Sequence, residues 1–594
     1  MNILIVPGCL WILFSSLAAI NKYFSFKFHK NTFPFTLFIL TLNMVVLVAT
    51  AYLLPFDLFH TANLNSDSNS SNSTIPIVAN DTMTNIQKRD LTNIIQEQQE
   101  QPSSIKYIWY SIYWIQFVLC WLIIPVLISY ISLKYELPRG KVRERMSKAI
   151  FQNVKFYSLC LVGIVIGIIY LVTSTGHSIR DFKPLLISLA HLYSLSYTLI
   201  LLSTGLIIFP RDLLSKARSP TLESNNKLFV ELSKVNDDLN DSQLNILDNA
   251  SKILNSNELT NGDVTFNELL NECKLEIQTK LSEIKISPTI TNPIGTSSPI
   301  NTLSKLNKNY NKFIVHYYNF IYNKTHSDEI IHTLAQSHKP SSELFKRVTL
   351  TILGLLSFIL SLLILFLEII PTKWAHGWIF LGNHWYNFAL EFIILHYNTM
   401  TSLYSMSKFK FISFHLIPSG QSNPSNALYY SLYSSRLLFP LCFNLMVLIP
   451  SAGTGLQTSF ETTLYNDLEL IPLVHFLNKY LPMIFMILIP VSYKYDLKQK
   501  ILLKVLGEEY YYQFFGMMMY EPTATNLNGN NNSNDLSPLN PGINNRSRID
   551  DDYEYSLQDG RYLFERVSGN FNLENTTPTT TTTTNNNNNN GSYV

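Results

Sequence analysis

Charged residues are scarce in this 594-residue chain, in which Asp, Glu, Lys and Arg make up 14% and the net charge is only +2. Soluble domains carry about 25% charged residues. A near-neutral charge also gives no reason to expect a nucleic-acid partner. Apolar runs alternate with Asn/Ser/Thr-rich tracts. This uneven composition predicts a multi-pass membrane protein with polar loops and tails rather than one large soluble core.

Cysteine is also rare, with five residues in the whole chain. Cys9, Cys120, Cys160 and Cys442 lie in apolar runs, and Cys273 lies in a polar region. No pair has the spacing of metal ligands. We therefore expect neither a disulfide framework nor a metal site.

Sequence motifs of catalysis are missing as well. The chain has no Walker A loop, Gly-rich dinucleotide turn, zinc-protease helix motif or nucleophile elbow, and its 13 histidines are scattered without ligand spacing. We predict a protein that is not an enzyme and that uses no cofactor. An intramembrane enzyme, which would assemble its site from separate helices, is a third interpretation after the two given below.

The apolar runs predict an all-α polytopic fold with about nine transmembrane helices, each near the roughly 20 residues that a bilayer requires. The candidate spans are 3–20, 33–55, 107–132, 156–173, 184–209, 347–370, 378–402, 429–450 and 477–494. The first run could instead be a cleaved signal peptide. The basic stretch "NKYFSFKFHK" after it favours an uncleaved helix with the N-terminus outside.

The distribution of Lys and Arg agrees with one orientation along the whole chain. The basic connections fall on the cytosolic side, together with the C-terminus, and the 452–475 loop on the opposite side has no Lys or Arg. The 57–105 loop then faces the lumen or the exterior. It contains the glycosylation candidates Asn69, Asn72 and Asn80. The composition does not distinguish the plasma membrane from a vacuolar or other endomembrane.

These features divide the chain into five regions. They are transmembrane helices 1–5 at 1–210, a cytosolic coiled-coil-like insert at 211–345, transmembrane helices 6–9 at 346–495, an amphipathic cytosolic helix at 496–520 and a disordered Asn/Thr-rich tail at 521–594. The insert has two segments with helical periodicity joined by a linker rich in helix breakers. This helix pair either packs on itself and on the membrane domain or binds a cytosolic protein partner. Within the tail, "DDYEYSLQDGRYLFERV" is either a motif that orders on a partner or a surface helical turn.

Polar side chains inside the predicted spans share helical faces. They are His384, Asn387, Glu391 and Asn398 in span seven, Tyr433, Arg436 and Asn444 in span eight, Gln116 in span three and His191 in span five. Interhelical hydrogen bonding explains such a set, and so does a hydrated cavity that admits an unknown small ligand.

Arg436 and Glu391 form the predicted intramembrane charge pair. Both lie roughly 12–14 Å into the membrane from the same side, at 1.5 Å per residue, on consecutive antiparallel spans. Glu368 is the rival partner of Arg436. An arginine at the centre of a span costs about 2.5–3.5 kcal/mol when unpaired, and pairing reduces that cost.

The segments "WYSIYWIQFVLCWLIIPVLISY", "GKVRERMSKAIFQNVKFY" and "GLIIFPRDLL", and above all "RLLFPLCFN" with "NKYLP" downstream, resemble the limb region 1-like membrane proteins. This is the family of the lipocalin-interacting membrane receptor, with a branch of limb region 1 domain-containing protein 2. The resemblance covers roughly 1–210 and 346–510. It implies nine spans, an outside N-terminus and a cytosolic helical insert. It brings no catalytic residues, and the family's roles range from ligand uptake to modulation of receptor signalling.

We predict a membrane receptor or scaffold that modulates signalling or trafficking through its cytosolic face. The alternative is a transporter or channel that uses a polar cavity between spans three, five, seven and eight. A cavity open around Arg436 would favour the transporter, and a closed bundle with a structured insert would favour the scaffold.

Overall fold

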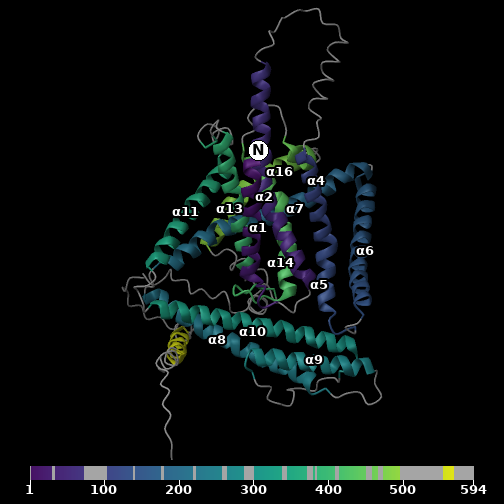
Figure 1. Ribbon diagram of the computed structural model, residues 1–594, viewed down its shortest axis with the longest axis vertical. Coiled ribbons are helices and arrows are strands. Elements are labelled where there is room, and N and C mark those ends of the chain that lie inside the picture. The colour runs from purple at the N-terminus through teal and green to yellow at the C-terminus, as the bar shows by residue number, and fades with distance from the viewer. Residues whose placement is uncertain are drawn as a thin grey trace, which may run out of the picture. The chain divides into compact units, whose positions relative to one another are not determined.

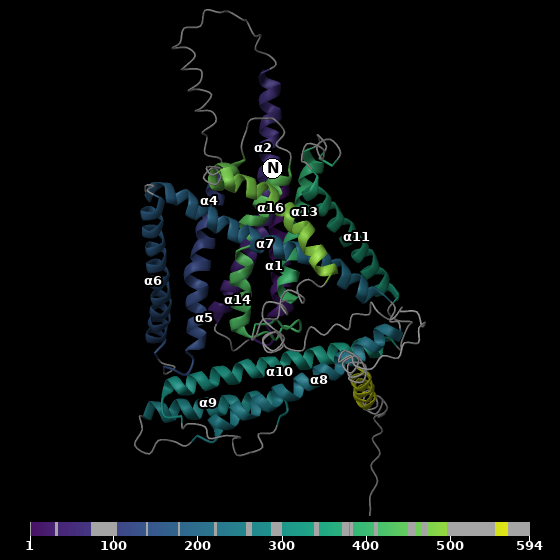
Figure 2. The same ribbon diagram turned by 180° about the vertical axis from the view of Figure 1, so that it is seen from behind.

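The computed structural model describes residues 2–29, 34–72, 104–137, 141–175, 179–218, 222–256, 264–286, 300–337, 344–370, 379–380, 384–408, 414–449, 458–465, 472–495 and 553–567. These residues form helices, with one isolated antiparallel bridge between Phe24 and Gln421 and no strand among them. The predicted all-α fold is confirmed. Figures 1 and 2 show it from opposite sides.

The first membrane half contains α1 (Asn2–Tyr23), α2 (Pro34–Asn72), α4 (Ser104–Val118), the π-helix η1 (Leu119–Ile123), α5 (Ile124–Ser132), α6 (Val142–Thr175) and α7 (Ile179–Ala217). The insert contributes α8 (Leu222–Leu254), α9 (Val264–Glu283) and α10 (Leu303–Ser337). The second half contains α11 (Leu344–Ile369), α13 (His384–Lys408), α14 (Pro424–Ser435), α15 (Leu438–Leu448), the π-helix η2 (Glu461–Tyr465) and α16 (Pro472–Lys494). Residues 553–567 form a further helix, here called the tail helix.

Seven helical segments in the described part of the chain are long and apolar enough to cross a membrane. They are Ile5–Tyr23, Pro34–Asn63, Ser104–Ser132, Val142–Gly167, Ala190–Ala217, Phe345–Ile369 and Pro424–Leu448. The chain is therefore an integral multi-pass membrane protein. The predicted count of nine is not confirmed. The other two predicted spans correspond to α13, which is not among these seven, and to α16, which has a shorter apolar stretch at Tyr480–Ser492.

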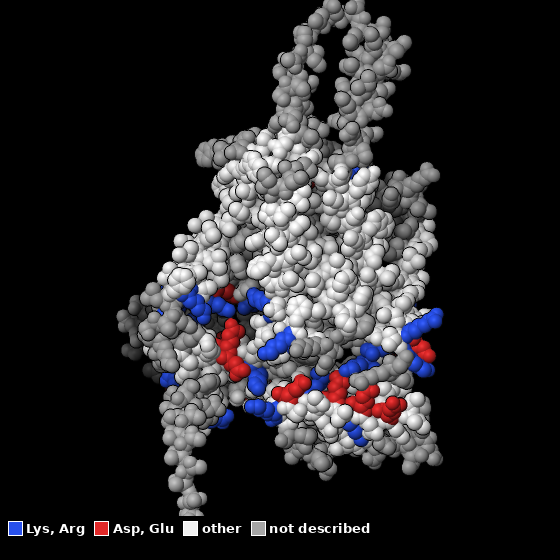
Figure 3. All heavy atoms as spheres, in the orientation of Figure 1, with Lys and Arg blue, Asp and Glu red and all other residues white. Residues whose placement is uncertain are grey.

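The apolar helices have the surface expected of segments in lipid. Large apolar side chains on α1, α6 and α11, such as Phe14, Leu159 and Ile352, are exposed. On the face drawn in Figure 3, the charged side chains gather at one end of the apolar helices and over α9, while the helices above are white. Burial of apolar groups supplies no driving force between helices in lipid, so close packing and polar contacts must hold the bundle together.

The chain divides into two compact units. The first comprises Met1–Arg218, Asn245–Tyr322 and Phe345–Ala524, and the second comprises Ser219–Leu244, Asn323–Leu344 and Thr525–Val594. In the first unit α13 packs against α2 and α7, α1 packs against α2, and α16 packs against α7. At Gly205 of α7 a Cβ atom would come within 2.3 Å of the Thr401 carbonyl oxygen of α13, so only glycine permits this approach.

Three insert helices are present where the sequence predicted a pair. The additional helix, α9, buries Phe266, Leu269, Leu270, Cys273, Ile277 and Leu281, whose spacing defines one helical face. Tyr310 and Tyr317 of α10 donate hydrogen bonds to Glu276 and Glu283 of α9 at 2.7 and 2.9 Å. The apolar face of α9 is a weak sequence signal because strongly polar residues separate its apolar positions.

The second unit contains the first part of α8, the last part of α10 and the tail helix. The prediction of a disordered tail over 521–594 is wrong for residues 553–567, which are helical and bury Phe564 in an apolar cluster. The rest of that tail and the predicted amphipathic helix at 496–520 lie outside the described residues.

The lumenal loop predicted at 57–105 begins later than expected, since α2 continues to Asn72. Asn69 and Asn72 fall in the last turns of that helix, and Asn80 lies outside the described residues. At the other boundary, α7 continues past residue 210 to Ala217. Helices α2 and α7 thus extend into the regions predicted as the lumenal loop and the insert.

Candidate functional site

The helix predicted over 429–450 is interrupted at its centre. α14 ends at Ser435 and α15 begins at Leu438, so Arg436 lies at the midpoint of the apolar segment Pro424–Leu448. The amides of Arg436 and Leu437 bond three residues back, to the carbonyls of Tyr433 and Ser434 at 3.3 and 3.1 Å. We call residues 435–438 the helix break.

Pro440 accounts for part of this geometry. It has no N–H to donate to the carbonyl four residues earlier, which is that of Arg436. The hydroxyl of Ser194 on α7 donates to this carbonyl instead, at 3.2 Å. The same arrangement occurs at Pro125 of α5, where the freed carbonyl of Trp121 accepts from the hydroxyl of Tyr157 at 2.6 Å. Side chains of neighbouring helices thus replace the missing backbone donors.

Two further helices donate to backbone carbonyls near the break. Gln116 of α4 donates to the carbonyl of Ser435 at 2.7 Å, and Asn43 of α2 donates to the carbonyl of Ser431 at 3.0 Å. Both side chains are buried. Cys120, the second residue of η1, contacts the hydroxyl of Ser435. The break is therefore a meeting point of α2, α4, α7 and α14, held by neutral amide and hydroxyl groups.

The side chain of Arg436 points to the outside of this meeting point. Its Nη1 donates to the hydroxyl of Tyr193 at 3.4 Å, and its guanidinium lies 5.4 Å from the ring centre of Tyr433. Tyr193 is 62% exposed, so this hydroxyl is on the surface of the bundle. Stacking on an aromatic ring stabilises a guanidinium but leaves its charge uncompensated.

The predicted ion pair between Glu391 and Arg436 is not formed among the residues that the structure describes. Glu391 is buried on α13, whereas Arg436 reaches Tyr193 on α7. The prediction assumed one continuous helix over 429–450. Arg436 instead lies at the helix break, where its guanidinium bonds to Tyr193 of α7. Glu368, the rival partner, accepts instead from the amide of Asn444 at 2.5 Å.

The other predicted polar residues separate into two groups. Gln116 and Tyr433 lie at the break, and His191 makes an edge contact with Phe443 at 4.5 Å between ring centres. His384, Asn387, Glu391 and Asn398 are all on α13, and the structure brings none of them to Arg436. The predicted single polar interior is thus divided.

The α13 group continues along α13 beyond the residues that the sequence singled out. Asn398 is fully buried, and neither its amide nitrogen nor its amide oxygen has a hydrogen-bond partner in the described part of the chain. The hydroxyls of Ser402 and Ser405, one and two turns further on, are likewise buried and without partners there. The oxygen of Asn387 shares this property. Buried polar groups without a hydrogen-bond partner are energetically costly, so this row lowers the stability of the bundle interior.

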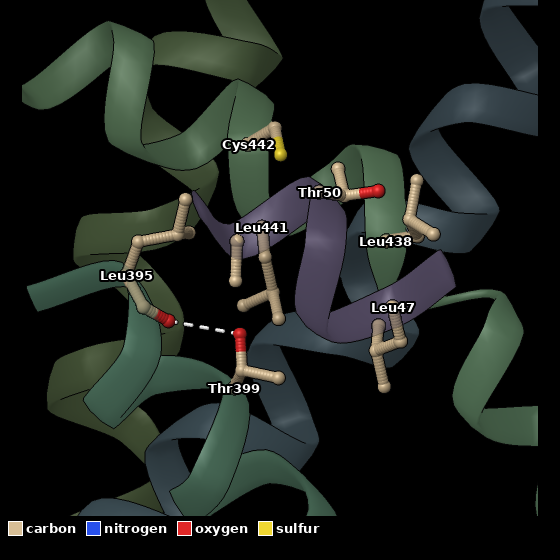
Figure 4. A pocket seen from close by; sticks show the side chains of 8 residues that line it. Leu47, Thr50, Leu395, Thr399, Leu438, Leu441 and Cys442 are labelled. Carbon is tan, nitrogen blue, oxygen red and sulfur yellow. Dashed lines mark hydrogen bonds between the residues drawn. The ribbon is translucent and has the colours of Figure 1, made fainter. Parts of the chain in front are cut away.

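Figure 4 shows the hollow where α2, α13 and α15 meet, which is lined by apolar side chains such as those of Leu47, Leu395, Leu438 and Leu441. The space between them is too small for a water molecule. A second hollow of about 30 Å³ lies between α1, α2 and α14, lined largely by apolar residues such as Ile20 and Met44. Neither space has the volume or the polar lining that a small-molecule site requires.

Sequence analysis missed two polar contacts that organise the bundle. Asn43 stands alone in an apolar run, and that isolation was the available signal. Asp57, placed in a loop by the sequence, is buried on α2 and accepts from the indole of Trp109 at 3.1 Å and from the amide of Phe460 at 2.9 Å. It ties α2 and α4 to the segment that precedes η2.

A charged cluster joins α9 and α10 to the turn after α5. Lys134 donates to both carboxylate oxygens of Glu276 at 2.6 Å, and Tyr135 and Tyr310 donate to the same carboxylate. We call these four residues the Glu276 cluster. Burial alone would raise the pKa of Glu276, but the charge of Lys134 and the three donors together hold this pKa below its usual value.

Two asparagines of α10 reinforce this attachment. The side-chain amides of Asn307 and Asn311 both donate to the carbonyl of Ser132, at 2.9 and 2.8 Å. The oxygen of Asn307 also accepts from the backbone amide of Tyr135 at 3.1 Å. The end of α5 is therefore hydrogen-bonded to the insert through its backbone as well as through the Glu276 cluster.

Comparison with known proteins identifies the family. The family model described as "LMBR1-like membrane protein" matches residues 1–494. The chain is 31% identical over 109 residues, 18% of its length, to the "G-protein coupled receptor-associated protein LMBRD2" of Caenorhabditis briggsae. It is 29% identical over 147 residues, 24% of its length, to "LMBR1 domain-containing protein 2 homolog B" of Dictyostelium discoideum. These matches span 16% and 18% of the two relatives. No solved structure matches the chain.

Proposed function

We propose that this chain, which belongs to the LMBR1-like membrane protein family, is a non-enzymatic membrane scaffold that associates with another integral membrane protein and modulates its signalling or trafficking. The family membership supports a multi-pass membrane protein. The printed name of the Caenorhabditis relative associates that relative with a G-protein coupled receptor. We extend this partner class to the present chain as part of the proposal.

One observation carries the proposal, which is the position of Arg436. Its guanidinium lies at the centre of an apolar span, beside the exposed hydroxyl of Tyr193, and has no carboxylate partner among the described residues. A lipid-facing charge at this depth costs about 2.5–3.5 kcal/mol even on insertion scales. A carboxylate or amide on the helix of a partner would offset that cost. Arg436 and Tyr193 therefore form the surface at which we place the partner.

The insert supplies the second element of a scaffold. The Glu276 cluster and the two asparagines on Ser132 attach α9 and α10 to the end of α5 by several bonds at once. A helical body fixed in this way transmits the position of a membrane partner to soluble proteins. We place this body and the C-terminus in the cytosol and the N-terminus outside, because the Lys/Arg-rich connections favour that orientation.

The test uses the full-length chain, crosslinked in intact membranes and purified with any receptor of the seven-helix class that accompanies it. Substitution Arg436→Gln removes the charge while keeping a hydrogen-bonding group. We expect recovery of the receptor to fall about tenfold or more, as it does when one member of a desolvated charge pair is removed. The matched control is Arg347→Gln, near the start of α11. Equal receptor recovery with both variants would refute the proposal.

A transporter remains the second candidate because of the broken helix itself. Interrupted helices with carbonyls facing side chains of other helices are typical of transporter binding sites. Cys442 is buried on α15, six residues beyond Arg436, and its reactivity tests whether water reaches this part of the bundle. The packed bundle predicts no reaction of Cys442 with a membrane-impermeant maleimide applied from either side. Rapid labelling of Cys442 in the folded chain would favour a water-filled path and the transporter.

A further inference from the structure

The tail helix occupies an apolar groove of the second unit. The groove is formed by Leu232 and Val235 of α8 and by Ile330 and Leu334 of α10, all of them buried. Phe564 of the tail helix inserts among these four residues and is 9% exposed. Without this ring the four apolar side chains would form an exposed patch, which proteins normally cover.

Three specific contacts fix the position of the tail helix along the groove. Ser233 donates to the carboxylate of Asp559 at 2.7 Å, and Arg561 donates to the side-chain oxygen of Asn226 at 3.1 Å. The guanidinium of Arg561 also lies 5.9 Å from the ring centre of Phe229. These contacts are directional, so they select a sequence as well as an apolar face.

Gly560 sets how closely the two helices approach. A Cβ atom at this position would lie 1.9 Å from the backbone carbonyl oxygen of Phe229, which cannot move aside as a side chain would. No other residue fits without displacing the helix. The contact surface thus requires the pattern Asp-Gly-Arg followed by Leu-Phe at 563 and 564.

We propose that the groove between α8 and α10 is a binding site for an amphipathic helix and that the tail helix is its tethered, exchangeable ligand. The tail helix has 15 residues, a length at which an isolated helix is marginal in water, so it depends on the groove for its structure. Residues 495–552 connect it to α16, and such a tether provides a high local concentration without strong intrinsic affinity. A free helix with the same pattern therefore enters the groove when the tail contacts are weakened.

The test uses the full-length chain in detergent and a fluorescent synthetic peptide covering residues 551–569. In the wild-type chain the tail helix competes with the peptide for the groove, so we expect the peptide to bind weakly. In the Gly560→Leu chain the tail cannot approach Phe229, and we expect the peptide to bind about tenfold more tightly or better, measured by anisotropy. A peptide that itself carries Gly560→Leu should not bind. The Tyr562→Leu peptide is the matched control, since Tyr562 is exposed, and it should bind normally.

Release of the tail is measured separately. Paired substitutions Ser233→Cys and Asp559→Cys should crosslink under mild oxidation in an otherwise unchanged chain, and Ser233→Cys alone should not. Adding Gly560→Leu should abolish the crosslink. Equal peptide binding by the wild-type and Gly560→Leu chains would overturn the proposal, as would absence of binding after the crosslink has been lost. Undiminished crosslinking with Gly560→Leu would overturn it as well, because close approach at Gly560 would then be unnecessary.

Discussion

The helix break at Arg436 and the attachment of the insert to the end of α5 both fasten separate helices through backbone carbonyls, but the two regions differ in the groups that assist. At the break the donors are the neutral side chains of Gln116, Asn43 and Ser194. In the Glu276 cluster an ion pair adds to the asparagine bonds on Ser132. The difference follows the surroundings, since a neutral amide costs far less to place among apolar helices than a charge does.

This comparison also explains why Arg436 is exceptional. It is the charged group of the helix break, and its side chain donates one long hydrogen bond, at 3.4 Å, to Tyr193 of α7 on the exposed side of the bundle. The other side-chain donors at the break are neutral groups. The cost of this charge at the centre of an apolar span is therefore the basis of the proposed partner surface.

Among the substitutions that test this difference between the two regions, we expect the largest effect from Glu276→Ala. It leaves Lys134, Tyr135 and Tyr310 without their acceptor, and we expect the attachment of the insert to weaken by about 2–3 kcal/mol, in the range of bonds to charged groups. The value is below that of a fully buried pair because the Glu276 side chain keeps 21% of its exposure. Thermal unfolding and limited proteolysis of the insert measure this weakening of the attachment. Glu268→Ala, exposed on the same helix, should change neither.

The ionised state of Glu276 makes the same attachment sensitive to acid. Its pKa in the folded chain is lower than its ordinary value of 4.5, so its contribution is complete above pH 4.5 and disappears as the pH falls through the lower, folded value. Proteolysis of the insert at stepped pH should show release below pH 4.5 in the wild type. Glu276→Gln should remove most of this dependence. An identical acid profile for both chains would show that another group controls the attachment.

A smaller effect is expected at the break. Gln116→Met preserves length but removes the donor to Ser435, and contacts of this kind in membrane bundles contribute about 0.6 kcal/mol on average and at most about 1.7. Reversible unfolding in mixed micelles resolves such a difference. Ser111→Ala is the control, because Ser111 is exposed on the same helix and bonds only within it. If Gln116→Met lowered the unfolding free energy as much as Glu276→Ala does, the two regions would not differ in the strength of their contacts.

The sequence permitted the all-α fold to be predicted because apolar runs and breaker-rich loops are local signals. It did not predict the helix break, because Pro440 can be accommodated in a continuous, kinked helix and only the donors on α2, α4 and α7 favour interruption. The predicted Glu391–Arg436 pair assumed such a continuous helix, and Arg436 bonds to Tyr193 instead. The binding of the tail helix to the groove could not be predicted from the sequence either. Its contacts join residues more than 300 positions apart in the chain, such as Ser233 and Asp559.

The smallest effect concerns truncation after residue 521, which removes the tail helix. The contacts of this helix described above are all with residues of the second unit, namely Phe229, Ser233, Asn226 and the cluster around Phe564. The hydrogen bonds of the helix break and of the Glu276 cluster belong to the first unit and remain intact. We therefore expect the unfolding free energy of the membrane bundle to change by no more than about 0.5 kcal/mol, as for a distant surface change. Size-exclusion profiles and melting of the truncated chain in detergent test this. Aggregation of the membrane bundle after truncation would show that the polar bonds at the break and at Glu276 do not suffice, and that the tail helix supports the fold of the first unit as well.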